Sequence, residues 1–224
     1  LVAMCVPVKW RQHLAGIAEG IGEASRSFHA PITGGNLTRA SELSLTVTVL
    51  GYAARPLGRN GARVGEIVYL TGALGGPGCA LDAWVSGGQP SPEHRARFAR
   101  PSPRIREALW LASHGATAAI DVSDGLLADA GHLAAASGVD VCIELDAIPV
   151  MRGASPFVAA KSGEEYELVV TTPAPVDEHT FAREFGVPLT RVGVITAPGE
   201  RGSRARLRSH GRFVDLPAGH DHFS

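Results

Sequence analysis

The 224-residue chain carries 21 basic and 22 acidic side chains, and its net charge of −1 gives it no overall field that attracts nucleic acid or an anionic membrane. With 45% hydrophobic and 19% charged residues, it can bury a core and is neither a disordered tail nor a fibrous repeat. Cys5, Cys79 and Cys142 are widely spaced, which indicates buried thiols in a reducing cytoplasm and argues against a disulfide framework. No apolar run approaches the roughly 18 residues that span a membrane.

The first part of the chain predicts a strand, a helix and two further extended segments. Residues 1–8 form an apolar run typical of a buried strand, and apolar side chains recur at helical spacing from Trp10 to about Phe28. A short extended segment, residues 30–33, follows. Apolar and polar residues then alternate over residues 43–49, which predicts a half-buried antiparallel strand.

A Gly-, Arg- and Pro-rich stretch, residues 52–66, is the expected domain junction. After it we expect a strand at 67–71, a helix at about 79–84, a polar surface stretch at 87–103, and a helix that Ser102 caps and that ends at His114. The Gly-rich residues between the first of these strands and its helix lack the Walker A and dinucleotide-binding patterns, so tight packing is their expected role.

The remaining elements alternate between strands and helices. A strand ending at Asp121 and a helix after it precede strands at 139–145, 168–171 and 192–195, a short helix at 176–185, and a solvated turn or hairpin in the Arg-rich residues 201–212. Because several strands alternate in polarity, we expect an α+β fold with mixed, largely antiparallel sheets and helices packed on one face, instead of a doubly wound sheet.

Residues 117–129 are the strongest candidate for chemistry. An apolar run ends at Asp121, and Ser123, Asp124 and Gly125 then lead into residues at helical spacing, so Ser123 or Asp124 is the expected N-cap. Two carboxylates beside free N–H groups of a helix N-terminus could hold a divalent metal and the phosphates it carries. A capping role is the simpler explanation, and this stretch alone favours it.

Two adjacent glycines suggest a second contact with phosphate. Gly34 and Gly35 permit a positive φ and a close approach of backbone N–H groups, and Asn36 offers a carbonyl oxygen to a hard cation. Arg39 or Arg59 could clamp a phosphate with a planar guanidinium. An ordinary Gly-Gly-Asn turn with exposed arginines explains the same residues.

Acidic residues crowd the start of the strand at 168–171. Alternation along the chain places Glu165 and Glu167 on one side and Glu164 and Tyr166 on the other. Three carboxylates this close together are costly unless a cation or polar ligand lies nearby. Solvation at a sheet edge would explain them equally well.

Taken together and in order, six segments resemble the thiamine-monophosphate kinase family. These segments are residues 34–39, 43–51, 59–72, 121–129, 163–168 and 219–223. The family belongs to an ATP-binding superfamily that includes aminoimidazole ribonucleotide synthetase. The resemblance implies that superfamily's two-domain architecture, with residues 1–55 as the C-terminal remnant of an ATP- and Mg-binding first domain and residues 56–224 as the second domain.

The resemblance also implies an activity, which is direct in-line transfer of the ATP γ-phosphoryl group to thiamine monophosphate in the presence of Mg²⁺. Because donor and acceptor are both anionic phosphates, positioning and metal ions supply the catalysis, and no covalent nucleophile is expected. It further implies a cytoplasmic enzyme that is a homodimer at full length and has no nucleic-acid or membrane partner.

Site residues follow from their positions in the family's motifs. The expected ATP-binding residues are Gly34, Gly35, Arg59 and Ser123, the expected Mg²⁺ ligands are Asn36, Asp121 and Asp124, and the expected substrate-binding residues are Glu164 and His220. Asn36 stands where the family has an aspartate, so a metal there should bind more weakly. His220 replaces a larger aromatic side chain, a change that loosens stacking on the substrate ring.

The family's first domain carries further metal-binding aspartates that this sequence does not include. We therefore expect the chain to be a piece of a longer protein, with little or no turnover alone. Two other functions stay open: another ATP-using member of the superfamily, such as an amidine-forming ligase, and a non-catalytic nucleotide-binding or dimerising remnant. The acidic segment around Glu164 and the terminal His-Asp-His-Phe favour the kinase.

Overall fold

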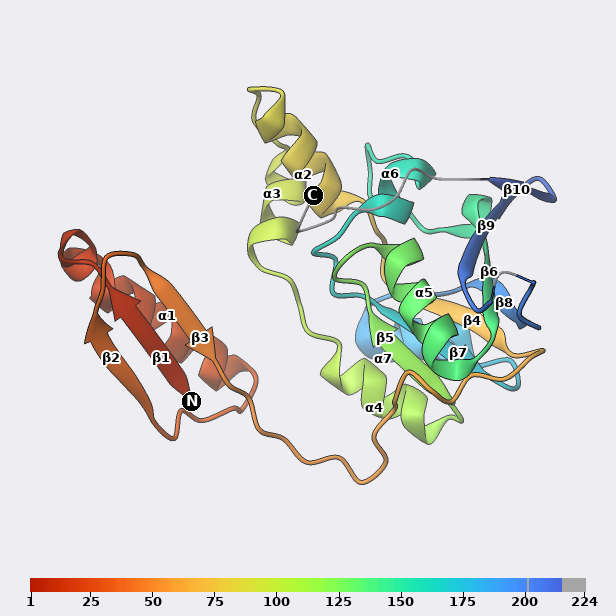
Figure 1. Ribbon diagram of the computed structural model, residues 1–224, viewed down its shortest axis with the longest axis horizontal. Coiled ribbons are helices and arrows are strands. Elements are labelled where there is room, and N and C mark those ends of the chain that lie inside the picture. The colour runs from red at the N-terminus through yellow and green to blue at the C-terminus, as the bar shows by residue number, and fades with distance from the viewer. Residues whose placement is uncertain (201, 215–224) are drawn as a thin grey trace. The chain divides into compact units, whose positions relative to one another are not determined.

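The computed structural model describes residues 1–200 and 202–214 of the chain. Contacts within the chain group into two units, Leu1–Ala54 and Arg55–Ser224 (Figure 1). The division falls within the Gly-, Arg- and Pro-rich stretch at residues 52–66. No described helix combines the length and the apolar character needed to cross a membrane.

The first unit is a three-stranded sheet with one long helix. Its central strand β1 (Val2–Val6) pairs in parallel with β2 (Gly35–Arg39) and antiparallel with β3 (Ser44–Val47). A 3-10 helix, η1 (Val8–His13), and α1 (Leu14–Ser27) connect β1 to β2. The order strand, helix, strand, strand is as expected, but the second strand lies at β2 and not at residues 30–33. That earlier segment contains Pro31, which has no N–H group to donate to a neighbouring strand.

The first unit buries little apolar surface. Val6 is the buried hydrophobic residue among its described positions, with 7% exposure, and α1 has no buried residue. The antiparallel strand expected at residues 43–49 is confirmed as β3. Its expected half-burial is wrong, because Leu45 and Val47 are 47% and 55% exposed. A sheet of three short strands with a single helix leaves such side chains uncovered.

The second unit is built on a seven-stranded mixed sheet. In spatial order the strands are β10 (Arg212–Val214), β9 (Ala205–Ser209), β6 (Asp140–Glu144), β8 (Leu189–Thr196), β4 (Ile67–Thr71), β7 (Leu168–Thr172) and β5 (Ala118–Asp121). β6 and β9 are parallel, and the other neighbouring pairs are antiparallel. The expected mixed, largely antiparallel sheet is therefore confirmed. The Arg-rich stretch contributes to a hairpin, as expected, and this hairpin of β9 and β10 extends to Val214.

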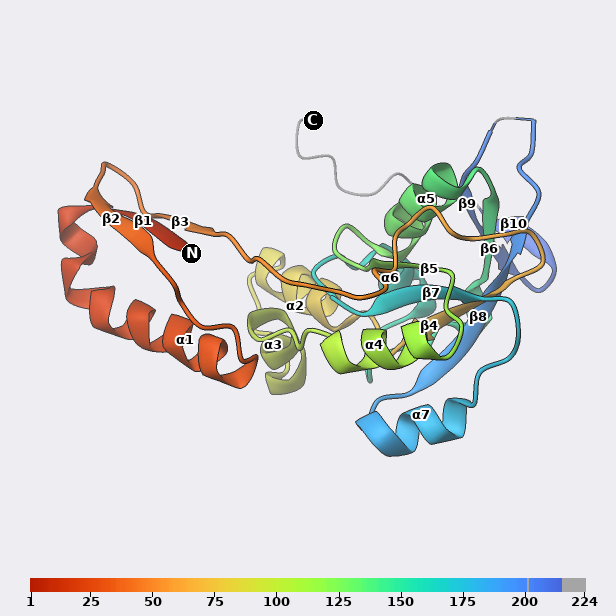
Figure 2. The same ribbon diagram turned by 90° about the horizontal axis from the view of Figure 1, so that it is seen from below.

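Helices cover both faces of this sheet (Figure 2). They are α2 (Gly76–Val85), α3 (Pro92–Ala99), α4 (Ile105–Ser113), α5 (Leu126–Ser137), α6 (Pro156–Lys161) and α7 (Glu178–Phe185), with a short 3-10 turn, η2 (Leu145–Ala147). α5 packs in the cluster that contains Val68 and Leu70, whereas α4 and α7 pack in the cluster that contains Ile67 and Tyr69. The expectation of helices on one face is thus wrong here, because β4 is apolar on both sides.

The helices α2, α3 and α4 begin at positions that the sequence pattern did not predict. The polar composition of residues 87–103 favours a loop, yet α3 forms there, with the Ser91 hydroxyl accepting a hydrogen bond from the backbone N of His94 at 3.2 Å. α4 begins at Ile105 with Arg104 as its N-cap residue, and not at the expected Ser102. α2 begins at Gly76, earlier than the expected Cys79, with a proline in its first turn.

Candidate functional site

Two segments of the second unit meet at one corner, which we call the acidic corner and define by Asp121, Ser123, Asp124, Glu164 and Tyr166. Asp121 ends the edge strand β5, and the chain then turns into α5. Residues 163–167 lie against this turn, because the backbone N of Glu164 donates to the carbonyl of Ser123 at 2.8 Å. The structure thus brings four sequence-predicted site residues together, namely Asp121, Ser123, Asp124 and Glu164.

The acidic corner carries an excess of negative charge. Asp121, Asp124 and Glu164 are all exposed, and no ion pair within the described part of the chain includes any of them. The Tyr166 hydroxyl donates to Glu164 Oε2 at 2.9 Å. This hydrogen bond, burial, and the charges of Glu164, Asp121 and Asp124 together raise the pKa of Tyr166. The three carboxylates therefore lie close enough together to influence the same side chain, that of Tyr166.

The loop that supplies Glu164 and Tyr166 has a strained backbone. Glu164 has a φ of 58° and Tyr166 a φ of 54°, in the left-handed region that costs a side-chain-bearing residue about 1–2 kcal/mol. Gly163 lies so close to the turn that an added Cβ would come within 2.7 Å of the Ser123 carbonyl oxygen. Surrounding contacts must hold such a loop in place.

The N-terminus of α5 is capped by a residue inside the helix. Asp129 Oδ2 accepts hydrogen bonds from the backbone N–H groups of Ser123, Asp124 and Gly125 at 3.0, 2.9 and 3.1 Å. Gly125 is the N-cap residue, so the expectation that Ser123 or Asp124 caps the helix is wrong. The N–H groups expected to be free for a phosphate at positions 123–125 are occupied by this carboxylate.

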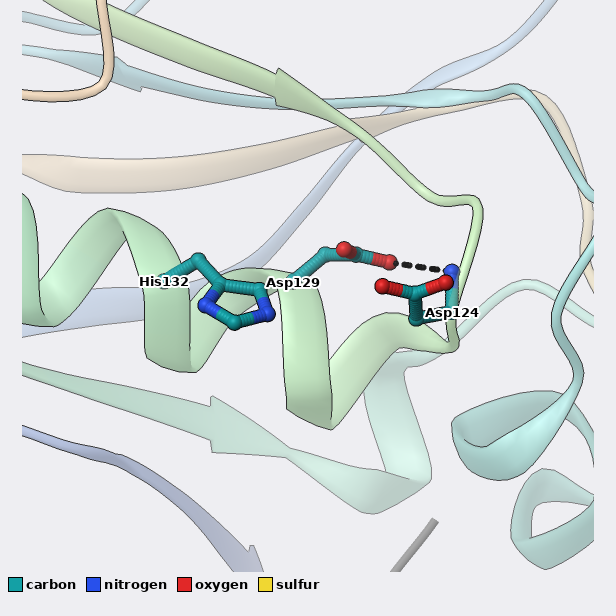
Figure 3. Close-up of side chains that lie close together, drawn as sticks. All are labelled: Asp124, Asp129 and His132. Carbon is teal, nitrogen blue, oxygen red and sulfur yellow. Dashed lines mark hydrogen bonds between the residues drawn. The ribbon is translucent and has the colours of Figure 1, made fainter. Parts of the chain in front are cut away.

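Asp129 and His132 add to the candidate metal ligands. Ligand atoms of Asp124, Asp129 and His132 lie within 4.8 Å of one another (Figure 3). Burial raises the pKa of Asp129, while its backbone hydrogen bonds act in the opposite direction. Sequence reasoning did not select this aspartate and histidine. Their spacing of three residues, which places two side chains on one face of a helix, was the available signal.

A buried layer of charge lies beneath the acidic corner. Glu165 and Glu167 are 0% and 1% exposed, on the side opposite to the exposed Glu164, so the expected alternation is confirmed. Solvation at a sheet edge is the wrong explanation for these carboxylates, because the guanidinium groups of Arg97 and Arg104 pair with Glu167. The compensating cations come from α3 and the start of α4, two regions remote in sequence.

The remaining predicted residues lie elsewhere in the chain. Gly34, Gly35 and Asn36 belong to the first unit, where Gly35 and Asn36 are opposite Val2 and Ala3 in the β1–β2 pair. A Cβ at Gly35 would lie 1.9 Å from the Val2 carbonyl oxygen. The close backbone approach expected at these glycines is therefore made to β1, and it requires glycine at position 35.

Arg59 lies at the opposite end of α5 from the acidic corner. Its carbonyl oxygen accepts a hydrogen bond from the hydroxyl of Ser137, the last residue of α5, at 2.7 Å. Its exposed side chain forms no hydrogen bond with another described residue. His220 lies outside the described residues, so its predicted role stays a prediction.

Comparison with known proteins shows which family this chain resembles. The chain matches the C-terminal domain of AIR synthase related protein over residues 63–205 and the N-terminal domain over residues 1–53. The curated thiamine-monophosphate kinase of Methanopyrus kandleri is 38% identical over 189 residues, which are 79% of this chain and 59% of that protein. The chain thus spans about three fifths of that relative's length.

Solved structures show the same relationship. The crystal structure of thiamine-monophosphate kinase from Stenotrophomonas maltophilia K279a has a TM-score of 0.84 at 30% identity and covers 95% of this chain and 72% of its own. AaThiL complexed with AMPPCP and TMP has a TM-score of 0.80 at 25% identity and covers 96% and 71%. Since the match to the C-terminal domain alone spans more than half of its residues, the chain belongs to the AIR synthase related family, and within it to the thiamine-monophosphate kinase family.

Proposed function

We propose that this chain serves an ATP- and Mg²⁺-dependent kinase that phosphorylates thiamine monophosphate to thiamine diphosphate by direct in-line transfer of the ATP γ-phosphoryl group. The observation that carries the proposal is the acidic corner, where three exposed carboxylates meet without an ion-pair partner among the described residues. The related AaThiL structure, complexed with AMPPCP and TMP, supports both substrates.

The donor groups at the acidic corner fit Mg²⁺. Carboxylate oxygens are the ligands that Mg²⁺ prefers, and Mg²⁺ is commonly bound through one or two carboxylates together with substrate phosphates. Asp121 and Asp124 would hold the ion. Asn36, whose side chain offers an amide oxygen, is also proposed as a Mg²⁺ ligand. When bound, Mg²⁺ neutralises and aligns the phosphate oxygens between which the phosphoryl group passes.

The other residues of the proposed site bind and orient the two substrates. Ser123 is proposed to hydrogen-bond the nucleotide, and Gly34, Gly35 and Arg59 to contact ATP. The carboxylate of Glu164 faces the thiamine moiety in this proposal, because the thiazolium ring of thiamine carries a positive charge that a nearby carboxylate attracts. The proposal assigns no covalent nucleophile, since phosphoryl transfer depends mainly on positioning and electrostatic stabilisation.

We include a homodimer and a cytoplasmic location in the proposal. Leu37 and Val47, on β2 and β3, are both 55% exposed, and each is paired with a residue of β1 in the small sheet. Such uncovered apolar side chains are suited to burial against a second copy. The three cysteines are free thiols, which is typical of proteins in a reducing compartment.

The test is a product assay combined with calorimetry on the 224-residue chain. Chromatography should detect no more than slow formation of thiamine diphosphate when ATP, Mg²⁺ and thiamine monophosphate are supplied, in line with the little or no turnover expected of this chain alone, and none when Mg²⁺ is replaced by a chelator. Calorimetry should detect Mg²⁺-dependent binding of a non-hydrolysable ATP analogue and binding of thiamine monophosphate. Absence of both product and thiamine monophosphate binding would overturn the proposal.

Two outcomes would point to the other functions. Nucleotide binding without thiamine monophosphate binding and without product favours a non-catalytic nucleotide-binding role. ADP formation with formylglycinamidine ribonucleotide, and none with thiamine monophosphate, favours an amidine-forming ligase.

A further inference from the structure

A buried network of charged groups supports the loop at residues 163–167 from below. Arg97 of α3 donates to the carboxylate of Glu167, and Arg104 donates to both oxygens of the same carboxylate. Thr71 of β4 donates a further hydrogen bond to Glu167 Oε2 at 2.7 Å. The side chain of Glu167 therefore joins three segments that are distant in sequence.

Arg97 also contacts the backbone of the loop. Its Nη2 atom donates to the carbonyl oxygen of Glu165 at 2.7 Å, and the Glu165 carboxylate in turn accepts from the backbone N of Gly75. A planar guanidinium can serve a carbonyl and a carboxylate at once, whereas a lysine ammonium lacks this fixed fork geometry.

The opposite side of the loop is attached to the turn after β5. The backbone N–H groups of Glu165 and Tyr166 both donate to the carbonyl of Val122, at 3.1 and 2.8 Å. The loop is thus held between the charged network and the turn that carries Asp124. These contacts hold Glu164 and Tyr166 in their strained left-handed conformation.

Burying these charged side chains costs free energy, because they lose their contact with water. Replacing buried ion pairs with apolar residues of similar volume is often neutral or stabilising. Here two buried polar atoms, Arg97 Nε and Glu165 Oε2, have no hydrogen-bond partner among the residues that the structure describes, although they lie 3.8 Å apart. Stability alone does not explain such an arrangement, whereas fixing the geometry of the loop does.

We propose that Arg97 and Glu167 are positioning residues that hold the loop at residues 163–167 so that Glu164 and Tyr166 stay at the acidic corner, and that they thereby set the affinity for the thiamine substrate. This inference rests on the function proposed above. Arg97 and Glu167 touch neither substrate in this proposal and act through the backbone of the loop.

The test compares Arg97→Lys and Glu167→Gln with Arg95→Lys, a control on the exposed side of the same helix. Calorimetry at a temperature well below the unfolding midpoint should give about tenfold weaker binding of thiamine monophosphate for the first two variants. Their affinity for the Mg²⁺ complex of a non-hydrolysable ATP analogue should stay within about twofold of wild type. Arg95→Lys should match wild type in both measurements.

Hydrogen exchange read by NMR provides a second measurement that does not depend on the substrate. The amides of Glu164 and Tyr166 should exchange at least about tenfold faster in Arg97→Lys, while amides of β4 exchange at the wild-type rate. Wild-type exchange at Glu164 and Tyr166 would overturn the positioning role, as would equal losses of affinity for both ligands. Faster loop exchange in a chain that binds no thiamine monophosphate would keep the positioning role and overturn the proposed substrate.

Discussion

The backbone N–H of Asp124 lies 2.9 Å from the Oδ2 atom of Asp129, a residue just inside the helix that this turn begins. The same oxygen accepts hydrogen bonds from the N–H groups on either side. One buried carboxylate therefore sets the shape of the turn that presents Asp124 at the acidic corner. The N–H groups at the helix N-terminus donate to a carboxylate of the chain itself, so they do not occupy the exposed carboxylates of the acidic corner. Those carboxylates remain available to a ligand.

Removing this carboxylate should destabilise the second unit. Asp129→Ala leaves three backbone N–H groups without their acceptor at a side chain that is 2% exposed, and we expect a loss of about 2–3 kcal/mol in the free energy of unfolding. Asp129→Asn keeps an acceptor oxygen and should lose less. Urea denaturation measures both variants, with exposed Asp82→Ala as the control. Equal stability of Asp129→Ala and the control would contradict the capping role.

Gly72 should tolerate no side chain. Its φ is 65°, and an added Cβ would lie 2.3 Å from the carboxylate carbon of Glu167, so Gly72→Ala forces the charged network apart. Gly138 has a similar φ of 68° and open space around it. We expect Gly138→Ala to cost about 1 kcal/mol through backbone strain and Gly72→Ala about 3 kcal/mol or more through strain and overpacking. Matching denaturation midpoints for the two variants would show that the clash is absent.

Glu165 should make stability depend on pH near neutrality. Burial, against weaker opposing effects from hydrogen bonds and Arg97, raises the pKa of Glu165 from 4.5 to about 7, and the charge of Glu167 adds to the rise. The folded chain therefore holds this proton more tightly than the unfolded chain does. The resulting stability is complete below pH 4.5 and is lost as pH rises through about 7, on the order of 3 kcal/mol in total.

Glu165→Gln isolates this effect because the amide does not titrate. The groups facing Glu165 are Arg97, Glu167 and Cys79, whose own pKa is raised by burial first and then by Asp82 and Glu165. Thermal unfolding from pH 5 to 8 should show the variant gaining stability relative to wild type as pH rises. Exposed Glu93→Gln should follow the wild-type curve. If the stability of wild type and of Glu165→Gln changed in parallel with pH, Glu165 would be ionised in the folded chain from pH 5 to 8, and the raised pKa would be contradicted.

Neutralising the acidic corner should weaken Mg²⁺-dependent nucleotide binding. Asp121→Asn and Asp124→Asn each remove one negative charge from exposed positions while keeping a ligand oxygen, so the apparent Mg²⁺ affinity should fall about tenfold per substitution. Titrating Mg²⁺ at a fixed concentration of a non-hydrolysable ATP analogue measures this change. Asp146→Asn, which alters a carboxylate that pairs with His210, is the matched control. An unchanged Mg²⁺ dependence in both corner variants would remove these residues from the proposed metal site.

Many helices and strands were predictable, because the local pattern of apolar and polar residues indicates them. The apolar run at Ile67–Thr71 indicates a strand whether it lies at the edge or the centre of a sheet, and the structure has β4 there. α3 was not predictable in the same way, since its residues are mostly polar and only Ser91 and Pro92 indicate a helix start. In the folded chain α3 places Arg97 beside Glu165 and Glu167. This pairing joins residues 68 and 70 positions apart, so the local sequence does not indicate it.

The sequence by itself determined which residues are candidates for the acidic corner, because Asp121 ends one strand, Ser123 and Asp124 follow it, and Glu164 precedes another strand. That these two segments meet was decided by the fold. Only the tertiary structure decided what surrounds them. Two of the three clustered glutamates are buried against Arg97 of α3 and Arg104, the N-cap residue of α4. The N–H groups at the N-terminus of α5 are occupied by Asp129. The physical reason is that a motif reports the order of groups along the chain, whereas the environment of a charge depends on residues that meet only after folding.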